Sequence, residues 1–163
     1  MKKITSKSFP NNIKLAAFDV DGVFTDGKFF LSDDGIESKM FCTQDGYGIK
    51  QLLIANIHVL ILSGRNSVSV ERRMAELGVK YVFQGCKDKV STFNSVISEL
   101  KVDIKDTVYT GDDIPDINLL KHSGYSIAVA NAVPKVKEIC NIVTISKGGQ
   151  GAVREICEYI LNA

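Results

Sequence analysis

The chain lacks an apolar run long enough to cross a bilayer. Its longest apolar stretch, around residues 59–62, falls far short of the roughly 20 residues that a membrane-spanning helix needs. The N-terminal residues 1–7 contain three lysines, but no apolar segment of the kind found in secretory signals follows them. We therefore expect a cytoplasmic protein that makes no contact with a membrane.

A strong net charge and the usual ligands of zinc are missing too. A net charge of +1 argues against the broad basic surface of a nucleic-acid-binding protein. There are only two histidines, and the four cysteines are far apart and include no Cys-x-x-Cys pair. This pattern predicts reduced, mostly buried cysteines in place of a zinc site: Cys42, Cys86, Cys140 and Cys157.

No repeat, low-complexity tract or linker rich in proline and glycine divides the chain. Its 163 residues, 45% hydrophobic and 24% charged, suffice for one domain with a well-filled core. We therefore predict a single domain over residues 1–163, with residues 1–13 as an N-terminal arm.

Predicted strands and helices alternate after this arm. Apolar runs predict strands at residues 15–19, 58–62, 81–83, 107–110, 126–129 and 142–145. Helical spacing predicts helices at 48–55, 67–77, 87–100, 114–122, 133–140 and 151–161. This order indicates a three-layer, Rossmann-like α/β fold whose parallel central sheet is covered on both faces. A turn signal at residues 32–35 adds a small β-hairpin over residues 28–41, inserted after the first strand, where it would project over the ligand-binding end.

Carboxylates gather where two predicted strands end. Asp19 and Asp21 follow the first strand, and Asp112, Asp113 and Asp116 follow the strand at 107–110. Because ligands bind beyond the carboxyl ends of parallel strands, these side chains should converge on one site. Two carboxylates about 4 Å apart repel by roughly 4 kcal/mol at an effective dielectric of 20, which a divalent cation would offset. Oxygen ligands and scarce histidines favour Mg²⁺.

Groups that bind anions lie at two further element ends. Ser63, Gly64 and Arg65 supply a hydroxyl, a backbone amide and a guanidinium, and Lys89 lies in the Lys87-Asp88-Lys89 segment that opens a helix. Together with the acidic strand ends they indicate a phosphoryl-transfer site. One carboxylate of the Asp-x-Asp pair would attack phosphorus while the other handles the proton of the leaving group.

Several of these residues also fit ordinary structural roles. Ser63 and Asp113 are of types that cap helices, and Arg65 fits a solvated surface position. The segment 148–151 and Arg154 fit either a loop into the last helix or a place beside the substrate. Two alternatives of a different class are a phospho-accepting receiver-like domain and a non-catalytic assembly module. A receiver, however, needs no general acid beside its nucleophile.

Four motifs in order resemble those of the haloacid dehalogenase superfamily of phosphatases: Asp19-x-Asp21-Gly22-Val23-x-Thr25-Asp26, Ser63-Gly64-Arg65, Lys89 and Gly111-Asp112-Asp113-x-x-Asp116. The resemblance implies that Asp19 is the nucleophile that becomes an aspartyl-phosphate, and that Asp21 is the general acid and then the general base. It also implies Mg²⁺ ligands on Asp19, the backbone carbonyl of Asp21 and Asp112, with Asp113 alongside.

The same resemblance assigns the phosphate-binding groups. Ser63 and the amide of Gly64 would hold the phosphate, and Lys89 would screen its charge and that of the nucleophile. Asp116 would orient Lys89 or metal-bound waters. Arg65 is the residue that we expect to hold a substrate carboxylate.

Three segments resemble a narrower branch of the superfamily that has no large cap domain: Asp45-Gly46-Tyr47-Gly48, Ser63-Gly64-Arg65 and residues 148–155. This branch dephosphorylates 3-deoxy-D-manno-octulosonate 8-phosphate, a sugar-acid precursor of lipopolysaccharide. The likeness implies a homotetramer in which a neighbouring subunit covers the active site. Because the chain stops at Ala163 without an extended tail, the 28–41 hairpin is the expected closing element. A nine-carbon ulosonate 9-phosphate is the alternative substrate, and Arg65 argues against it because relatives with that preference tend to carry another residue after Ser/Thr-Gly.

Overall fold

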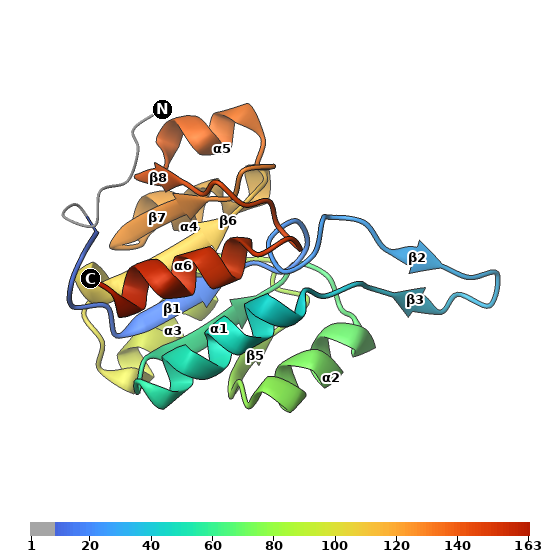
Figure 1. The fold of residues 1–163 in the computed structure, drawn as a ribbon, viewed down its shortest axis with the longest axis horizontal. Helices are drawn as coiled ribbons and strands as arrows, with labels where there is room; N and C mark the ends of the chain where they lie inside the picture. Colours follow the sequence, from blue (N-terminus) through green and yellow to red (C-terminus); the bar gives the residue numbers. More distant parts are fainter. Residues whose placement is uncertain (1–8) are drawn as a thin grey trace.

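A six-stranded parallel sheet forms the centre of the computed structural model, which describes residues 9–163 (Figure 1). The strand order is β5-β4-β1-β6-β7-β8. The strands are β1 (Leu15–Phe18), β4 (His58–Leu62), β5 (Tyr81–Phe83), β6 (Thr107–Gly111), β7 (Tyr125–Ala128) and β8 (Ile142–Val143). In the register of the central strands, Leu15 pairs with His58 on one side and with Thr107 on the other. β1 therefore has a parallel neighbour on both sides, β4 and β6.

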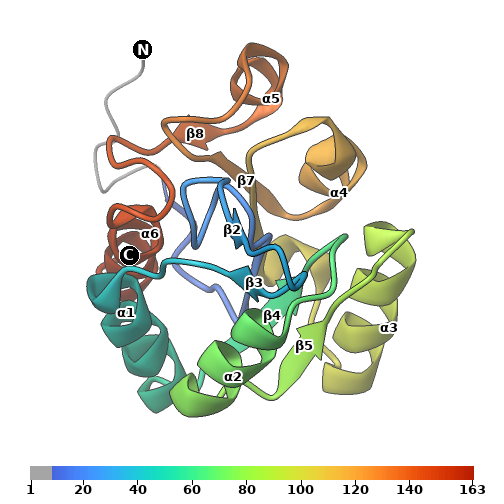
Figure 2. The same ribbon diagram turned by 90° about the vertical axis from the view of Figure 1, so that its right-hand side faces the viewer.

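Helices cover both faces of this sheet, which confirms the predicted three-layer α/β fold. Figure 2 shows α1 and α6 side by side on one face, with α3 and α4 on the other. The helices are α1 (Thr43–Ile54), α2 (Val68–Leu77), α3 (Lys89–Leu100), α4 (Ile117–His122), α5 (Pro134–Ile139) and α6 (Ala152–Leu161), with 3₁₀ turns η2 (Ile104–Asp106) and η3 (Ile114–Asp116).

The buried strand β1 fixes the position of the acidic residues that follow it in the sequence. All four of its residues are fully buried, so the strand reads as an uninterrupted apolar run. The ring of Phe18, its last residue, packs edge-on against Phe24 at 5.6 Å between centroids. The residues that follow Phe18 are thus fixed at the carboxyl edge of the sheet.

Helix α1 begins five residues earlier than the sequence predicted. Gly46 and Gly48 both lie inside the helix, although glycine is a poor helix former, and both are closely approached by neighbouring side chains. A Cβ on Gly46 would lie 2.3 Å from the guanidinium of Arg73, and one on Gly48 would lie 3.1 Å from Cys157. Tertiary packing against α2 and α6 therefore overrides the local helix preference of these glycines.

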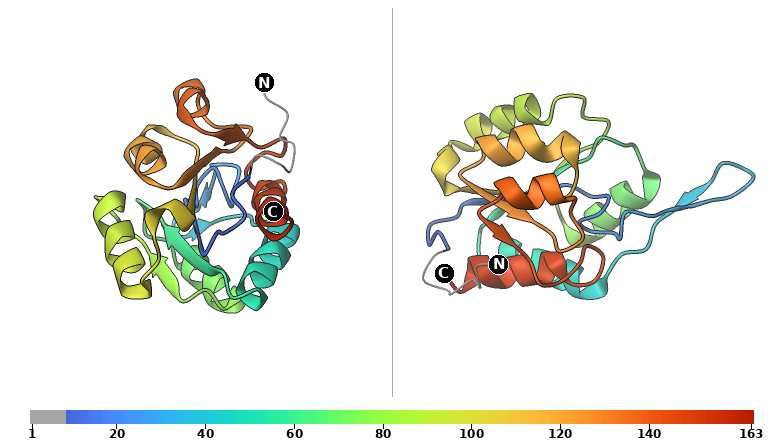
Figure 3. Two further views of the ribbon diagram at one scale, coloured as in Figure 1. Left: turned by 90° about the vertical axis from the view of Figure 1, so that its left-hand side faces the viewer. Right: turned by 90° about the horizontal axis from the view of Figure 1, so that it is seen from above.

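A long hairpin leaves the domain after β1 and carries β2 (Phe30–Leu31) and β3 (Glu37–Ser38) (Figures 1 and 3). It has the expected place in the chain, although its paired strands are shorter than the flanks that we predicted. Phe30, Leu31 and Met40 are largely exposed on it. The outer part of the hairpin thus buries little of its own apolar surface.

The chain ahead of β1 joins the core where the structure describes it. Phe9 and Ile13 are buried, and the Phe9 ring lies 4.9 Å from that of Tyr125. Residues 9–13 therefore pack against the domain, while the rest of the expected arm, residues 1–8, lies outside the described residues. All four cysteines are unpaired thiols. Among residues 9–163 there is no helix long and apolar enough to cross a membrane.

Candidate active site

The predicted site residues meet at the carboxyl edge of the sheet. After β1 the chain continues to β4 on one side of it, and later to β6 on the other side. Connections that diverge in this way leave a crevice at the carboxyl end of β1. A cavity of about 370 Å³ lies there, and it is lined by all nine of the predicted site residues: Asp19, Asp21, Ser63, Gly64, Arg65, Lys89, Asp112, Asp113 and Asp116.

Lys89 connects the two acidic strand ends. Its ammonium, buried at the first position of α3, donates to Asp19 Oδ1 at 2.6 Å and to Asp116 Oδ1 at 2.7 Å. The hydroxyl of Tyr109, a β6 residue that the sequence analysis placed in a strand but not in the site, also donates to Asp116 Oδ1 at 2.6 Å. The other oxygen of Asp116 accepts from the backbone amides of Asp112, at 3.0 Å, and Asp113, at 3.3 Å. Asp116 thus positions both Lys89 and the loop after β6.

The arrangement of carboxylates fits a divalent cation. Oxygen atoms of Asp19, Asp112 and Asp116 lie within 4.8 Å of one another. Burial, together with the charge of Asp116, raises the pKa of Asp19 to about 7. Burial and the charge of Asp19 raise the pKa of Asp112 to about 8. This excess of negative charge is what a bound cation would neutralise.

Asp19 and Asp112 are the two carboxylates of this cluster best suited to hold Mg²⁺. Both oxygens of Asp116 already accept hydrogen bonds, so its carboxylate is committed to the protein. Gly22 keeps the space beside Asp112 open, because a Cβ there would lie 2.0 Å from Asp112 Oδ2. Hard oxygen donors around a small gap fit Mg²⁺.

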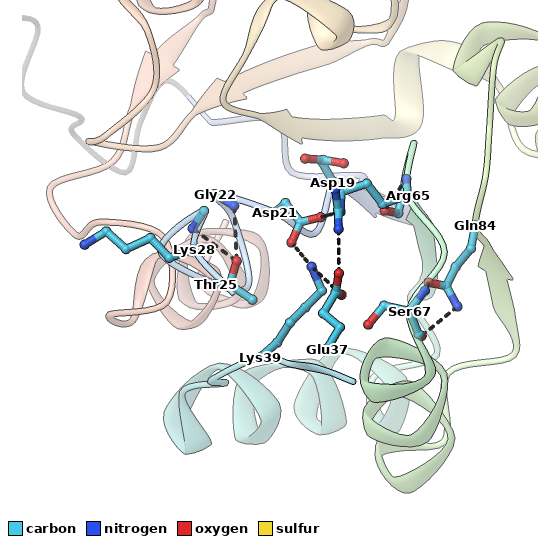
Figure 4. A network of polar contacts seen from close by, with 12 residues as sticks. Asp19, Asp21, Gly22, Thr25, Lys28, Glu37, Lys39, Arg65, Ser67 and Gln84 are labelled. Carbon is cyan, nitrogen blue, oxygen red and sulfur yellow. Dashed lines mark hydrogen bonds and ion pairs between the residues drawn. The ribbon is translucent and has the colours of Figure 1, made fainter. Parts of the chain in front are cut away.

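Asp21 lines the same cavity but pairs with a different set of charges (Figure 4). Lys39, whose side chain is fully buried, forms an ion pair with Asp21 Oδ1, and Arg65 Nε lies 3.7 Å from Asp21 Oδ2. Glu37 contacts both cations from β3. Sequence reasoning missed Glu37 and Lys39, since the hairpin was expected as a lid and no pattern showed which of its residues point inward.

The anion-binding side of the cavity comes from the ends of β4 and the start of α3. Ser63 is buried, and its hydroxyl accepts from the amide of Arg65 at 3.2 Å. It does not cap the next helix, because Ser67 is the residue that precedes α2. Asp88 is the N-cap of α3 and accepts from the amides of Val90 and Ser91 at 3.1 Å. The N-terminus of α3 therefore delivers Lys89 to the cavity.

Asp113 and the glycine-rich segment have supporting places. Asp113 is exposed, and its carboxylate accepts from the amide of Ile114 at 2.7 Å, as a capping residue of η3 does. Gly148 packs on the backbone of Gly22, whose carbonyl oxygen would lie 1.8 Å from a Cβ there. Gly149 donates to the carbonyl of Val23 at 3.0 Å. This segment thus braces the loop after β1 from outside the cavity lining.

Asp45 connects α1 to α6, the helix that follows the 148–151 segment. It is buried in the first turn of α1 and accepts from the amide of Arg154 in α6 at 2.9 Å. The guanidinium of Arg154 stacks 4.8 Å from the ring centroid of Tyr47 and pairs with Glu158 at 2.7 Å. The Asp45-Gly46-Tyr47-Gly48 motif therefore joins α1 to α6 and does not line the cavity.

Comparison with known proteins shows which family this chain resembles. Residues 82–156 match the family of haloacid dehalogenase-like hydrolases. The chain is 40% identical over 152 residues to 3-deoxy-D-manno-octulosonate 8-phosphate phosphatase of Escherichia coli strain K12. The matched region covers 93% of this chain and 81% of that protein. The enzyme of the same name from Salmonella typhimurium LT2 has the same identity and coverage.

Two solved structures with this fold carry the same name. The phosphatase from Yersinia pestis matches with a TM-score of 0.91 at 39% identity, over 93% of this chain and 82% of that one. The Moraxella catarrhalis enzyme, in complex with a magnesium ion, a phosphate ion and KDO, matches with a TM-score of 0.90 at 38% identity, over 93% and 87%. The chain therefore belongs to the haloacid dehalogenase-like hydrolases and, within them, to the family of 3-deoxy-D-manno-octulosonate 8-phosphate phosphatases.

Proposed function

We propose that this chain hydrolyses 3-deoxy-D-manno-octulosonate 8-phosphate to 3-deoxy-D-manno-octulosonate and inorganic phosphate, with Mg²⁺ as cofactor. The observation that carries the proposal is the buried contact of Lys89 with Asp19, in a cavity that a second carboxylate, Asp21, also lines. The relatives named for this reaction, one of them in complex with magnesium, phosphate and KDO, support the choice of substrate and cofactor.

The first step forms an aspartyl-phosphate. An oxygen of Asp19 attacks phosphorus, the bond between phosphorus and the sugar oxygen breaks, and Asp21 gives its proton to that leaving oxygen. Burial alone would favour the neutral amine of Lys89, but the charges of Asp19 and Asp116 raise its pKa, so it stays an ammonium beside the phosphate. Mg²⁺, held by Asp19, Asp112 and the backbone carbonyl of Asp21, would neutralise charge on the phosphoryl oxygens.

The second step returns the enzyme to its starting state. A water molecule attacks phosphorus of the aspartyl-phosphate, Asp21 accepts the proton of that water, and the bond from phosphorus to Asp19 breaks. The hydroxyl of Ser63 and the amide of Gly64 hold the phosphate through both steps. This division of roles explains why the chain needs two carboxylates one residue apart.

Arg65 is the group that favours a sugar acid over a neutral sugar. Its side chain lines the cavity and is half exposed, so a substrate carboxylate can reach it. The nine-carbon ulosonate 9-phosphate remains the second candidate, because it carries the same carboxylate.

Steady-state phosphate release tests the proposal directly. Purified chain is assayed with the eight-carbon and nine-carbon sugar-acid phosphates and with glucose 6-phosphate, each in Mg²⁺ and in excess chelator. We expect the highest kcat/KM for the eight-carbon substrate and loss of turnover with chelator. No Mg²⁺-dependent turnover of either sugar-acid phosphate would contradict the proposal. A long-lived phospho-Asp19 without turnover would indicate a receiver-like protein instead.

The assembly and location of the protein belong to the same proposal. We propose one domain over residues 1–163 that forms a homotetramer in the cytoplasm, with the hairpin of a neighbouring subunit over each active site. The exposed Phe30, Leu31 and Met40 support this role of the hairpin, since they offer apolar surface that the domain itself does not cover.

A further inference from the structure

Arg65, the cation expected to bind the substrate carboxylate, already has carboxylate neighbours within the chain. Its Nη2 donates to Glu37 Oε2 at 2.5 Å, and its Nε lies 3.7 Å from Asp21 Oδ2. The guanidinium stacks on the ring of Phe29, with Cζ 4.4 Å from the centroid. Glu37 and Phe29 both come from the hairpin, which therefore holds Arg65 from two directions. Figure 4 shows the contact between Glu37 and Arg65.

The positions of these contacts on the guanidinium decide what they block. Nε–H and one Nη–H of an arginine point the same way and form an edge that can grip one carboxylate with two parallel hydrogen bonds. In this chain the edge formed by Nε and Nη2 faces two different carboxylates, those of Asp21 and Glu37. A substrate carboxylate can use this edge only after Glu37 leaves it.

We propose that Glu37 acts as a built-in competitor for the substrate carboxylate at Arg65, and thereby limits how strongly the site prefers a sugar acid. The inference rests on the proposed function, because it takes the substrate to be a sugar acid. A sugar-acid phosphate displaces Glu37 with its own carboxylate and gains Arg65. A neutral sugar phosphate offers no replacement anion, and Glu37 stays.

Lys39 lowers the free-energy cost of moving Glu37 away from Arg65. Its ammonium lies 3.3 Å from Glu37 Oε1 and also pairs with Asp21, and it is 5.5 Å from the centroid of the Phe29 ring. When Glu37 leaves Arg65, its charge remains paired with Lys39, so no carboxylate is left isolated.

The test is the Glu37→Gln variant, which keeps the size of the side chain but removes its charge. We compare kcat/KM for 3-deoxy-D-manno-octulosonate 8-phosphate and for glucose 6-phosphate, and the inhibition constant of the product sugar acid. The ratio of the two kcat/KM values should rise roughly two- to fivefold, the range of a partly exposed ion pair, and the product should bind more tightly by a similar factor. In Glu37→Gln/Arg65→Met the gain should vanish.

Asp103→Asn is the matched control, because it removes one exposed negative charge ahead of β6, outside both the hairpin and the cavity lining. It should leave the ratio where it is in the wild type. An unchanged or lower ratio in Glu37→Gln, in a chain that turns over the sugar-acid phosphate, overturns the proposal and indicates that Glu37 only holds Arg65 in place. A wild-type chain that turns over no sugar-acid phosphate refutes the proposed function instead, so the two failures are distinguishable.

Discussion

At the scale of single residues, the site depends on one buried cation between two acidic strand ends. Lys89 reaches Asp19 and Asp116 within 2.7 Å, and Asp116 in turn fixes the backbone of the loop that carries Asp112. A carboxylate with both oxygens engaged acts through its neighbours, which makes Asp116 a positioning residue.

Asp116→Asn should lower kcat by roughly 10²–10³-fold, because an amide cannot accept from all four donors around it and leaves Lys89 with a single carboxylate. Asp113→Asn is the control, since it makes the same chemical change at an exposed helix-capping position where asparagine serves equally well. It should change kcat less than about threefold. Equal losses in both variants would show that the loop tolerates no change of charge at all.

The raised pKa values of Asp19 and Asp112 predict how metal and pH act together. Both acids have folded-state pKa values, about 7 and about 8, above the ordinary value of 3.8. In the metal-free protein, the contribution of these two acids to folding stability is therefore fully present below about pH 4, where both are protonated. That contribution is lost as the pH rises through 7 and 8. Mg²⁺ binds the deprotonated acids, so its affinity should rise at least roughly tenfold from pH 6 to pH 8.

Calorimetric titration with Mg²⁺ at pH 6, 7 and 8 measures this dependence, and melting curves measure its effect on stability. Mg²⁺ should raise Tm more at pH 8 than at pH 6, and Asp112→Asn should remove most of that difference. A metal affinity that does not change with pH would contradict the account.

At the scale of elements, the segment ahead of α6 braces the loop after β1, and α1 holds the start of α6 in place. Gly148 and Gly149 lie against the Gly22 turn, and Asp45 caps the helix that follows them. Burial raises the pKa of Asp45 to about 6, and its Oδ2 has no hydrogen-bond partner among the described residues. The contribution of this acid to stability is thus complete below about pH 4 and falls as the pH rises through 6.

Asp45→Asn should be about as stable as the wild type at pH 7.5, because the amide oxygen can accept from Arg154 without burying a charge. It should also flatten the change of stability between pH 4 and 6.5. Asp45→Ala loses the cap altogether and should unfold more easily by about 1–2 kcal/mol. Urea unfolding at several pH values separates the two, and equal losses would mean that the charge itself stabilises α6.

At the scale of the whole molecule, the hairpin projects away from the rest of the domain (Figure 3). Its side chains Phe30, Leu31 and Met40 are exposed and apolar. Phe30→Ser/Leu31→Ser should lower the mass in solution from four times the 17.9 kDa of one chain toward a single chain. Turnover should fall on the order of tenfold, since the active site loses its cover. Ile54→Ser, which changes a similarly exposed side chain outside the hairpin, is the control. Light scattering that finds a monomeric, fully active wild type would contradict the proposed tetramer.

The fold was largely predictable because its strands are continuous apolar runs and its acids stand where those runs end. The buried β1 followed by Asp19 and Asp21 is a local pattern, and so is the left-handed Gly78 that ends α2. The hairpin's contacts with the site were not predictable, because Glu37 and Lys39 act across 28 and 18 residues of sequence. Only the three-dimensional arrangement shows which hairpin residues face Asp21 and Arg65.

The most direct test of the account is a search for phosphate on Asp19. Asp21→Asn should still pass phosphate to the nucleophile, slowly, but should fail to activate the water that removes it. Single turnover of ³²P-labelled sugar-acid phosphate, quenched in acid and mapped by peptide, should therefore find label on Asp19 in Asp21→Asn, and none in Asp19→Asn, which should also lose turnover. Label on another residue, or undiminished turnover in Asp19→Asn, would contradict the central claim that Asp19 is the nucleophile.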